Sequence, residues 1–139
     1  MRRSKAISVL SVLALTTLGS AVTAPAAHAG GYGCAGNLVW SAEVTDMNGG
    51  EAGWLYDYWD GTDNCSVFVK TEYAGTKTWT NLSIINSAGV SGGHDYGSFS
   101  TYAGPVRVNG VGVCVHEFVA ENDLNGNQFV NWLSGDHGC

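Results

Sequence analysis

Four aromatic residues, Trp54, Tyr56, Tyr58 and Trp59, stand close together in the segment GWLYDYWDG. Side chains alternate between the two faces of an extended strand, so Trp54, Tyr56 and Tyr58 share one face with rings about 7 Å apart. A row of exposed rings with polar edges suits the carbon-rich faces of sugar rings. The alternative is that the rings belong to the core, because a small β-protein needs large apolar side chains inside. The spacing therefore predicts either a polysaccharide-binding platform or a part of the core.

Histidines beside acidic residues are the candidates for metal binding. They show no i, i+4 histidine pair and no H-E-x-x-H pattern, so we interpret them as surface histidines beside solvating acids. The segment Asp123–Asn127 resembles the beginning of a calcium loop, but its glycine stands at the fourth position instead of the sixth. We expect an ordinary Asn/Asp turn there and no metal site. The histidines and their acids are His94 with Asp95, His116 with Glu117, and His137 with Asp136.

Acidic pairs are the remaining candidates for catalysis. Glu117 with Glu121, and Asp57 with Asp60, carry the carboxyl groups that glycoside hydrolysis needs. Spacing along β-structure does not establish the separation that this mechanism requires. GVSGG at residues 89–93 matches the G-x-S-x-G pattern, but no helical pattern follows it to make a nucleophile elbow, and no phosphate-binding glycine loop precedes a helix. We therefore predict no catalytic residues, no cofactor and no enzymatic activity.

The beginning of the chain has the pattern of a secretory signal peptide. Residues 1–5 include three basic side chains, residues 6–22 are apolar and rich in small side chains, and Ala27-His28-Ala29 fits the A-x-A cleavage pattern. A lone membrane anchor is disfavoured, because the apolar run is short and basic residues do not follow it. We expect residues 1–29 to be removed and residues 30–139 to form one secreted domain.

All four cysteines, Cys34, Cys65, Cys114 and Cys139, lie in the expected secreted part. An even number in a small exported chain indicates two disulfides, and the absence of a C-x-x-C pair argues against zinc. Sequence alone leaves three pairings open. We favour Cys34–Cys65 with Cys114–Cys139, because each then closes a local loop and the second holds the C-terminus.

The secreted part is acidic, which limits its partners. Its basic residues are Lys70, Lys77 and Arg107, against twelve acidic residues, for a net charge of −9. Nucleic acids and anionic membranes attract clustered lysine and arginine. We therefore expect no nucleic-acid partner and, after signal cleavage, no membrane partner.

Alternating apolar residues predict strands over residues 37–45, 77–86 and 128–133, and a hairpin over residues 53–73. The hairpin turn, Asp60–Asn64, has the Asp, Gly and Asn residues that tight reversals favour. No window has helical periodicity. We expect an all-β fold, a small antiparallel sandwich or barrel of about six to eight short strands stapled by two disulfides.

Two further segments are less regular. Residues 87–97 lack periodicity and predict a mobile loop, followed by a short strand over residues 98–102. Residues 106–118 are strand-like but are interrupted at Asn109-Gly110. That dipeptide predicts either a hairpin turn or a bulge in one long strand.

Short motifs along the chain resemble a known family. They are a glycine-rich start around Cys34 (GYGCAG, residues 31–36), NCSV at residues 64–67, TYAGPV at residues 101–106 before the Val-rich strand into Cys114, and a cysteine near the C-terminus, Cys139. Together they resemble the spore-associated protein A family, small secreted proteins of filamentous, spore-forming bacteria. Residues 87–97 and 121–127 show no such match. The resemblance implies an extracellular protein of spores or aerial hyphae with no established enzymatic activity, and it brings no catalytic residues.

These observations predict a secreted, non-enzymatic protein of the spore or cell surface. Three functions remain open. The first is binding of wall polysaccharide through the aromatic residues. The second is inhibition of an extracellular hydrolase through the rigid hairpin tip at Asp60–Asn64, since rigid loops lose little entropy on binding. The third is a passive role in a coat.

Overall fold

The computed structural model describes residues 30–139, and the predicted signal peptide, residues 1–29, lies outside this part. The described residues form strands joined by turns and contain no helix of the length and apolarity needed to cross a membrane. The prediction of an all-β fold is confirmed. The eight strands are β1 (Asn37–Thr45), β2 (Glu51–Trp59), β3 (Asp63–Lys70), β4 (Thr78–Asn86), β5 (Ser91–Phe99), β6 (Tyr102–Asn109), β7 (Val115–Asn122) and β8 (Gln128–Leu133).

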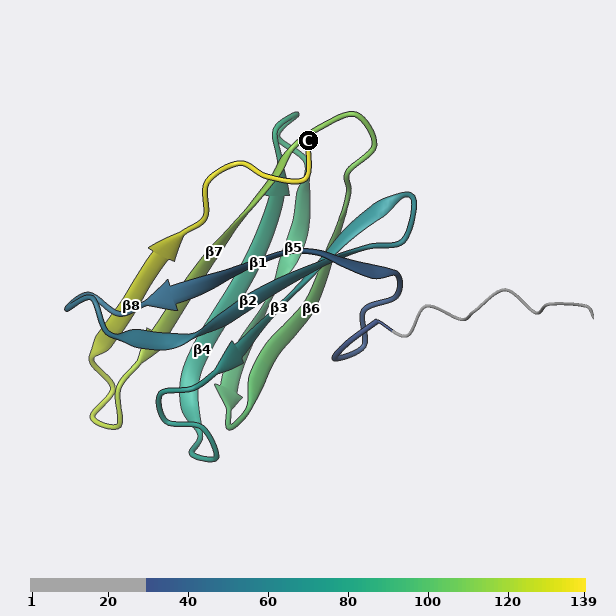
Figure 1. Cartoon of the computed structure of the whole chain (residues 1–139). Coiled ribbons are helices and arrows are strands. Elements are labelled where there is room, and N and C mark those ends of the chain that lie inside the picture. Colours follow the sequence, from purple (N-terminus) through teal and green to yellow (C-terminus); the bar gives the residue numbers. More distant parts are fainter. Residues whose placement is uncertain (1–29) are drawn as a thin grey trace, which may run out of the picture.

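The strands form two antiparallel sheets that pack face to face as a sandwich. The first sheet has the order β1-β2-β3-β6 and the second has the order β5-β4-β7-β8. Figure 1 shows β1 and β2 crossing the strands of the second sheet obliquely. Apolar side chains from both inner faces fill the space between the sheets, among them Leu55 and Phe68 from the first and Leu82, Ile84 and Val119 from the second.

The alternation predicted for the central hairpin matches the burial of its residues. Leu55 and Asp57 of β2 are fully buried between the sheets, and so are Ser66 and Phe68 of β3. The opposite face of β3 carries the disulfide-bonded Cys65, which packs in a second, smaller apolar cluster on the outer side of the sheet. One sheet therefore has two apolar faces, one in the main core and one beneath the N-terminal segment.

The prediction of a mobile loop over residues 87–97 is wrong for residues 91–97, which belong to β5. The predicted strand over residues 98–102 is also wrong, because β5 ends at Phe99 and β6 begins only at Tyr102. β5 is an edge strand whose residues are mostly exposed or half-buried, so it needs no alternating apolar pattern. Pairing with β4 holds it in place.

The segment around Asn109-Gly110 is neither a hairpin turn nor a bulge. β6 ends at Asn109 in the first sheet, and β7 begins at Val115 in the second. The dipeptide therefore begins a connection that carries the chain from one sheet to the other. Turn chemistry alone does not reveal whether the strands that it joins are paired.

The favoured disulfide pairing is confirmed. Cys34–Cys65 joins residues 31 positions apart and fixes the N-terminal segment against the outer face of β3. Cys114–Cys139 joins residues 25 positions apart and holds the C-terminal tail beside the beginning of β7. Both bonds attach a segment without regular structure to the sandwich.

Candidate functional site

The four aromatic residues that the sequence singles out do not share one surface. Trp54 and Tyr56 lie half-buried on the outer face of the first sheet. Tyr58 shares this face but is buried, in the small apolar cluster that Cys34 and the glycine-rich N-terminal segment cover. Trp59 borders a separate groove near the C-terminus. Within this set, only Trp54 and Tyr56 remain partly accessible on the face predicted as a platform.

Two tyrosines that the sequence analysis does not single out extend this face. Tyr32 stacks on Tyr56 with 6.3 Å between ring centroids and 16° between ring planes. It also meets the ring of Tyr102 edge to face at 5.2 Å. Tyr32 is 42% exposed and Tyr102 is 37% exposed. We call these three rings, Tyr56, Tyr32 and Tyr102, the tyrosine row.

A disulfide and a strand pairing hold two members of the tyrosine row, Tyr32 and Tyr102, in place. Tyr32 precedes Cys34 by two residues, so the Cys34–Cys65 disulfide anchors its segment to β3. Tyr102 opens β6 and pairs with Val69 of β3. Sequence patterns do not predict the contact between Tyr32 and Tyr102, because Tyr32 lies in a glycine-rich stretch without periodicity, 70 positions from Tyr102.

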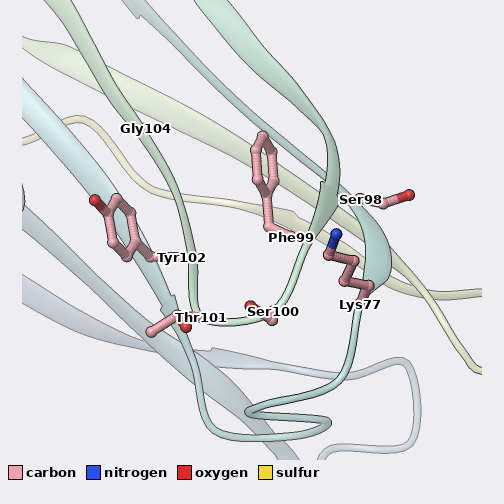
Figure 2. Close-up of a pocket in the computed structure, with 7 residues that line it drawn as sticks. All are labelled: Lys77, Ser98, Phe99, Ser100, Thr101, Tyr102 and Gly104. Atoms are coloured by element: carbon pink, nitrogen blue, oxygen red, sulfur yellow. The ribbon is translucent and has the colours of Figure 1, made fainter.

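A groove of about 340 Å³ adjoins the tyrosine row at Tyr102. Figure 2 shows the rings of Tyr102 and Phe99 on either side of the Ser100-Thr101 turn, with Lys77 on the Phe99 side. The wall combines aromatic rings with hydroxyl groups and one ammonium group, which can exchange hydrogen bonds with sugar hydroxyls. Its lining residues are Lys77, Ser98, Phe99, Ser100, Thr101, Tyr102 and Gly104.

A buried ion pair supports the turn at the base of this groove. The ammonium group of Lys70 lies 3.0 Å from Glu121 Oε1, and both side chains are fully buried. The same ammonium group donates to the Phe99 carbonyl at 2.9 Å, and the Lys70 backbone N–H donates to the Thr101 carbonyl at 2.9 Å. Burial raises the pKa of Glu121, while hydrogen bonds from Thr78 and Lys70 oppose the rise. The turn that presents Tyr102 thus rests on the core.

A second polar cluster lies between the sheets at the end near the C-terminus. Asp57 comes from β2, Glu117 from β7 and His137 from the tail, and all three are buried. His137 Nε2 lies 2.7 Å from Glu117 Oε2, and His137 Nδ1 lies 3.5 Å from Asp57 Oδ2. The Trp40 ring stacks on the imidazole at 3.7 Å and 8°. We call Asp57, Glu117 and His137 the buried triad.

Polar neighbours hold the two carboxyl groups of the triad. Asn64 Nδ2 donates to Asp57 Oδ2 at 2.6 Å, and Ser66 Oγ donates to Glu117 Oε1 at 2.6 Å. Burial raises the pKa of Asp57 to about 7, and the nearby Glu117 adds to the rise. Asp57 Oδ1 and His137 Nδ1 have no hydrogen-bond partner. The buried triad therefore lies between the sheets, away from the outer face that carries the tyrosine row.

The interpretation of the histidines as surface residues is wrong for His137, which is 8% exposed. It is right for His116, whose Nδ1 lies 3.0 Å from Asp136 Oδ1 on the exposed side of the protein. His94 is exposed beside Asp95, a half-buried residue that accepts a hydrogen bond from the Gly104 N–H. The reason for the difference is the Cys114–Cys139 disulfide, since it draws the tail and His137 inward.

The acidic pairs considered as candidates for catalysis do not form joint sites. Glu117 belongs to the buried triad, whereas Glu121 pairs with Lys70. Asp57 is buried, whereas Asp60 lies in the exposed hairpin turn.

The predicted Asn/Asp turn is present. The Asp123 side chain accepts hydrogen bonds at 2.8 Å from the backbone N–H groups of Asn125 and Asn127. This pattern is that of an Asx turn, in which an aspartate side chain closes its own loop.

No protein family model, curated protein or solved structure matches this chain. The evidence for its function is therefore the arrangement of its own residues.

Proposed function

We propose that this chain is a secreted, non-enzymatic protein of the spore or cell surface that binds polysaccharide through the tyrosine row and the adjoining groove. The observation that carries the proposal is the contact of Tyr32 with both Tyr56 and Tyr102 on an exposed sheet face. The rings form a surface that continues into the groove beside Tyr102. Such a surface stacks against sugar rings, while the groove supplies hydrogen bonds.

The surroundings of the site favour a neutral or weakly charged glycan over other ligands. Lys77 is the only ammonium group that lines the groove, and the secreted part is strongly acidic. An acidic protein repels polyanions such as nucleic acids. Rings framed by hydroxyl groups suit a polysaccharide better, because they offer both stacking and hydrogen bonding.

The proposed location rests on three observations. Two disulfides are expected in a protein that folds in an oxidising compartment. The first residues have the pattern of a signal peptide. The short motifs around Cys34, Cys65 and residues 101–106 resemble the spore-associated protein A family.

Co-sedimentation with insoluble chitin, cellulose and purified bacterial cell wall tests the proposal. The wild-type protein should sediment with at least one of these polymers, and Tyr32→Ala should bind much less. Tyr96→Ala is a matched control, because Tyr96 is 61% exposed on β5 of the other sheet. Binding that Tyr32→Ala and Tyr96→Ala reduce equally, or no binding at all, would contradict the proposal.

The hairpin tip supports a second candidate, inhibition of an extracellular hydrolase. Asp60 Oδ1 accepts hydrogen bonds from the backbone N–H groups of Thr62 and Asp63 at 2.9 and 2.8 Å. The Gly110 N–H donates to the Thr62 carbonyl at 3.0 Å. A loop held in this way loses little entropy when it binds. Inhibition of proteases or amylases that is lost in Asp60→Ala would favour this candidate, and absence of inhibition would remove it.

A further inference from the structure

We propose that the buried triad is a pH-sensitive latch on the C-terminal tail, residues 134–139: protons shared among Asp57, Glu117 and His137 hold the tail against the sandwich, and loss of a proton at alkaline pH loosens it. His137 belongs to the tail, whereas Asp57 and Glu117 belong to β2 and β7, which lie in opposite sheets. The latch is separate from the tyrosine row and independent of the proposed function.

The two carboxyl groups of the triad face opposite edges of one imidazole ring. Glu117 Oε2 lies 2.7 Å from His137 Nε2, which is a hydrogen-bond distance, whereas Asp57 Oδ2 lies 3.5 Å from His137 Nδ1. In a neutral imidazole one ring nitrogen carries a hydrogen and the other presents a lone pair. When Nε2–H donates to Glu117, the lone pair of Nδ1 therefore points toward Asp57 and repels an ionised carboxylate. A proton on Nδ1 or on Asp57 turns this repulsion into attraction.

The burial of the triad makes such protons necessary. Asp57 and Glu117 are fully buried, and His137 is 8% exposed. With a neutral imidazole and both carboxyl groups ionised, two negative charges would lie between the sheets without a counter-charge, which is unfavourable. One added proton halves this charge and a second removes it. Groups this close titrate together, so the protons belong to the triad as a unit and not to one residue.

Charged groups around the triad are already paired with one another. Lys70, a buried cation of β3, pairs with Glu121. His116 of β7 pairs with Asp136 of the tail on the exposed side of the protein. The triad thus depends on its own protons for balance. Its other neighbours carry no charge; they are Trp40 from β1, Asn64 and Ser66 from β3, and Ser134 from the tail.

The environment of Asp57 determines the direction of the pH dependence. Burial raises the pKa of Asp57 from 3.8 to about 7, and the nearby Glu117 adds to the rise. A carboxyl group whose pKa is higher in the closed state stabilises that state fully below its ordinary pKa, and this contribution is lost as pH rises through the raised pKa. The closed tail is therefore stabilised below about pH 7 and weakened above it.

The tail can loosen without leaving the protein. Val115 and His137 exchange two backbone hydrogen bonds, at 2.8 and 3.0 Å, and these bonds close the tail onto β7. The Cys114–Cys139 disulfide lies directly beyond them and keeps the segment tethered when they open. Withdrawal of His137 would uncover the Trp40 ring, which stacks on the imidazole at 3.7 Å and 8°.

Hydrogen exchange of the wild-type protein between pH 6 and 9 tests the latch, with each protection factor referred to an unstructured chain at the same pH. Above about pH 7, protection of the Val115 and His137 amides should fall by up to about tenfold for each pH unit. The Lys70 amide, which donates to the Thr101 carbonyl at the other end of β3, is the reference and should keep its protection. The carboxyl carbon signal of Asp57 should shift over the same pH range.

Two matched substitutions locate the titrating group. Asp57→Asn keeps an acceptor for Asn64 but cannot ionise, so protection of Val115 and His137 should change by less than about twofold between pH 6.5 and 9. Asp136→Asn makes the same change at the exposed carboxyl group next to His137 and should keep the wild-type dependence.

The wild type alone can overturn the proposal, so the test does not depend on whether a core variant folds. Equal protection of Val115 and His137 at pH 6.5 and pH 9 would overturn it. An equal fall in protection at Lys70 would do the same, since it would show opening of the whole domain. A pH dependence that Asp57→Asn retains, or that Asp136→Asn abolishes, would also contradict the latch.

Discussion

Replacing Lys70 with methionine should destabilise the protein strongly, because it leaves Glu121 buried without its counter-charge. Both side chains of this ion pair are fully buried, and their charged atoms lie 3.0 Å apart. Removing one partner of a buried pair costs about 3–5 kcal/mol of the free energy of unfolding. Methionine keeps most of the volume of the lysine stem, so the loss reflects the charge and its hydrogen bonds more than a cavity.

The loss of stability in Lys70→Met should depend on pH, and the raised pKa of Glu121 determines the direction of this dependence. Burial raises the pKa of Glu121 from its usual value of 4.5, while Thr78 and Lys70 hold it down. Without Lys70 the pKa rises further. A carboxyl group whose pKa is higher in the folded state contributes stability below its unfolded pKa, and this contribution is lost as pH rises through the folded pKa. The destabilisation by Lys70→Met should therefore be small near pH 4 and grow as pH rises.

Urea unfolding with the disulfides intact, at pH 4 and pH 7.5, measures this difference. Lys77→Met is the control, because Lys77 is exposed and its replacement should change the stability by no more than about 0.5 kcal/mol. Adding Glu121→Gln to Lys70→Met should recover part of the loss at pH 7.5, since no buried charge then remains. A loss below about 1 kcal/mol at pH 7.5, or the same loss at both pH values, would refute the reasoning.

Three further substitutions test the fold. Cys65→Ser opens the first disulfide and should lower the free energy of unfolding by about 3–4 kcal/mol, so an unchanged Tm would contradict the stabilising role assigned to that bond. Gly104→Ala should cost about 1–3 kcal/mol in thermal unfolding, because φ is 109° and a Cβ would lie 2.8 Å from the Ser66 carbonyl oxygen. Gly135→Ala, with open space around its Cβ position, is the matched control and should be nearly neutral. Asp60→Ala should lower the free energy of unfolding and speed hydrogen exchange at the two amides that Asp60 holds; unchanged exchange would show that the side chain does not fix the hairpin turn.

Local patterns along the chain predicted much of the fold. The strand over residues 37–45 and the faces of the central hairpin are as the alternation of side chains indicates. The disulfide pairing follows from closing short loops. Most of β5 was not predicted as a strand. An exposed edge strand is held by pairing with its neighbour and needs no apolar face, so it shows no alternating pattern.

The tyrosine row and the buried triad depend on contacts between segments that are far apart in the chain. The spacing of residues along the sequence does not reveal such contacts. Tyr32 reaches Tyr102 only because a disulfide lays the N-terminal segment over β3. Likewise, Asp57 and His137 are 80 positions apart in the chain and meet because the tail folds back beside β7. Alternation places Asp57 and Leu55 on the same face of β2, but it could not show that this face lies inside or which groups would surround the carboxyl group there.

The most direct test of the central claim compares the affinities of Tyr102→Ala and Tyr96→Ala for the wall polymer that the wild type binds best. Both residues are exposed tyrosines, but only Tyr102 belongs to the tyrosine row and lines the groove. Sedimentation isotherms should show about a tenfold weaker Kd for Tyr102→Ala, which corresponds to about 1.4 kcal/mol, and less than about a twofold change for Tyr96→Ala. Equal affinities for the two variants, with both folded, would contradict the assignment of the tyrosine row as the binding surface.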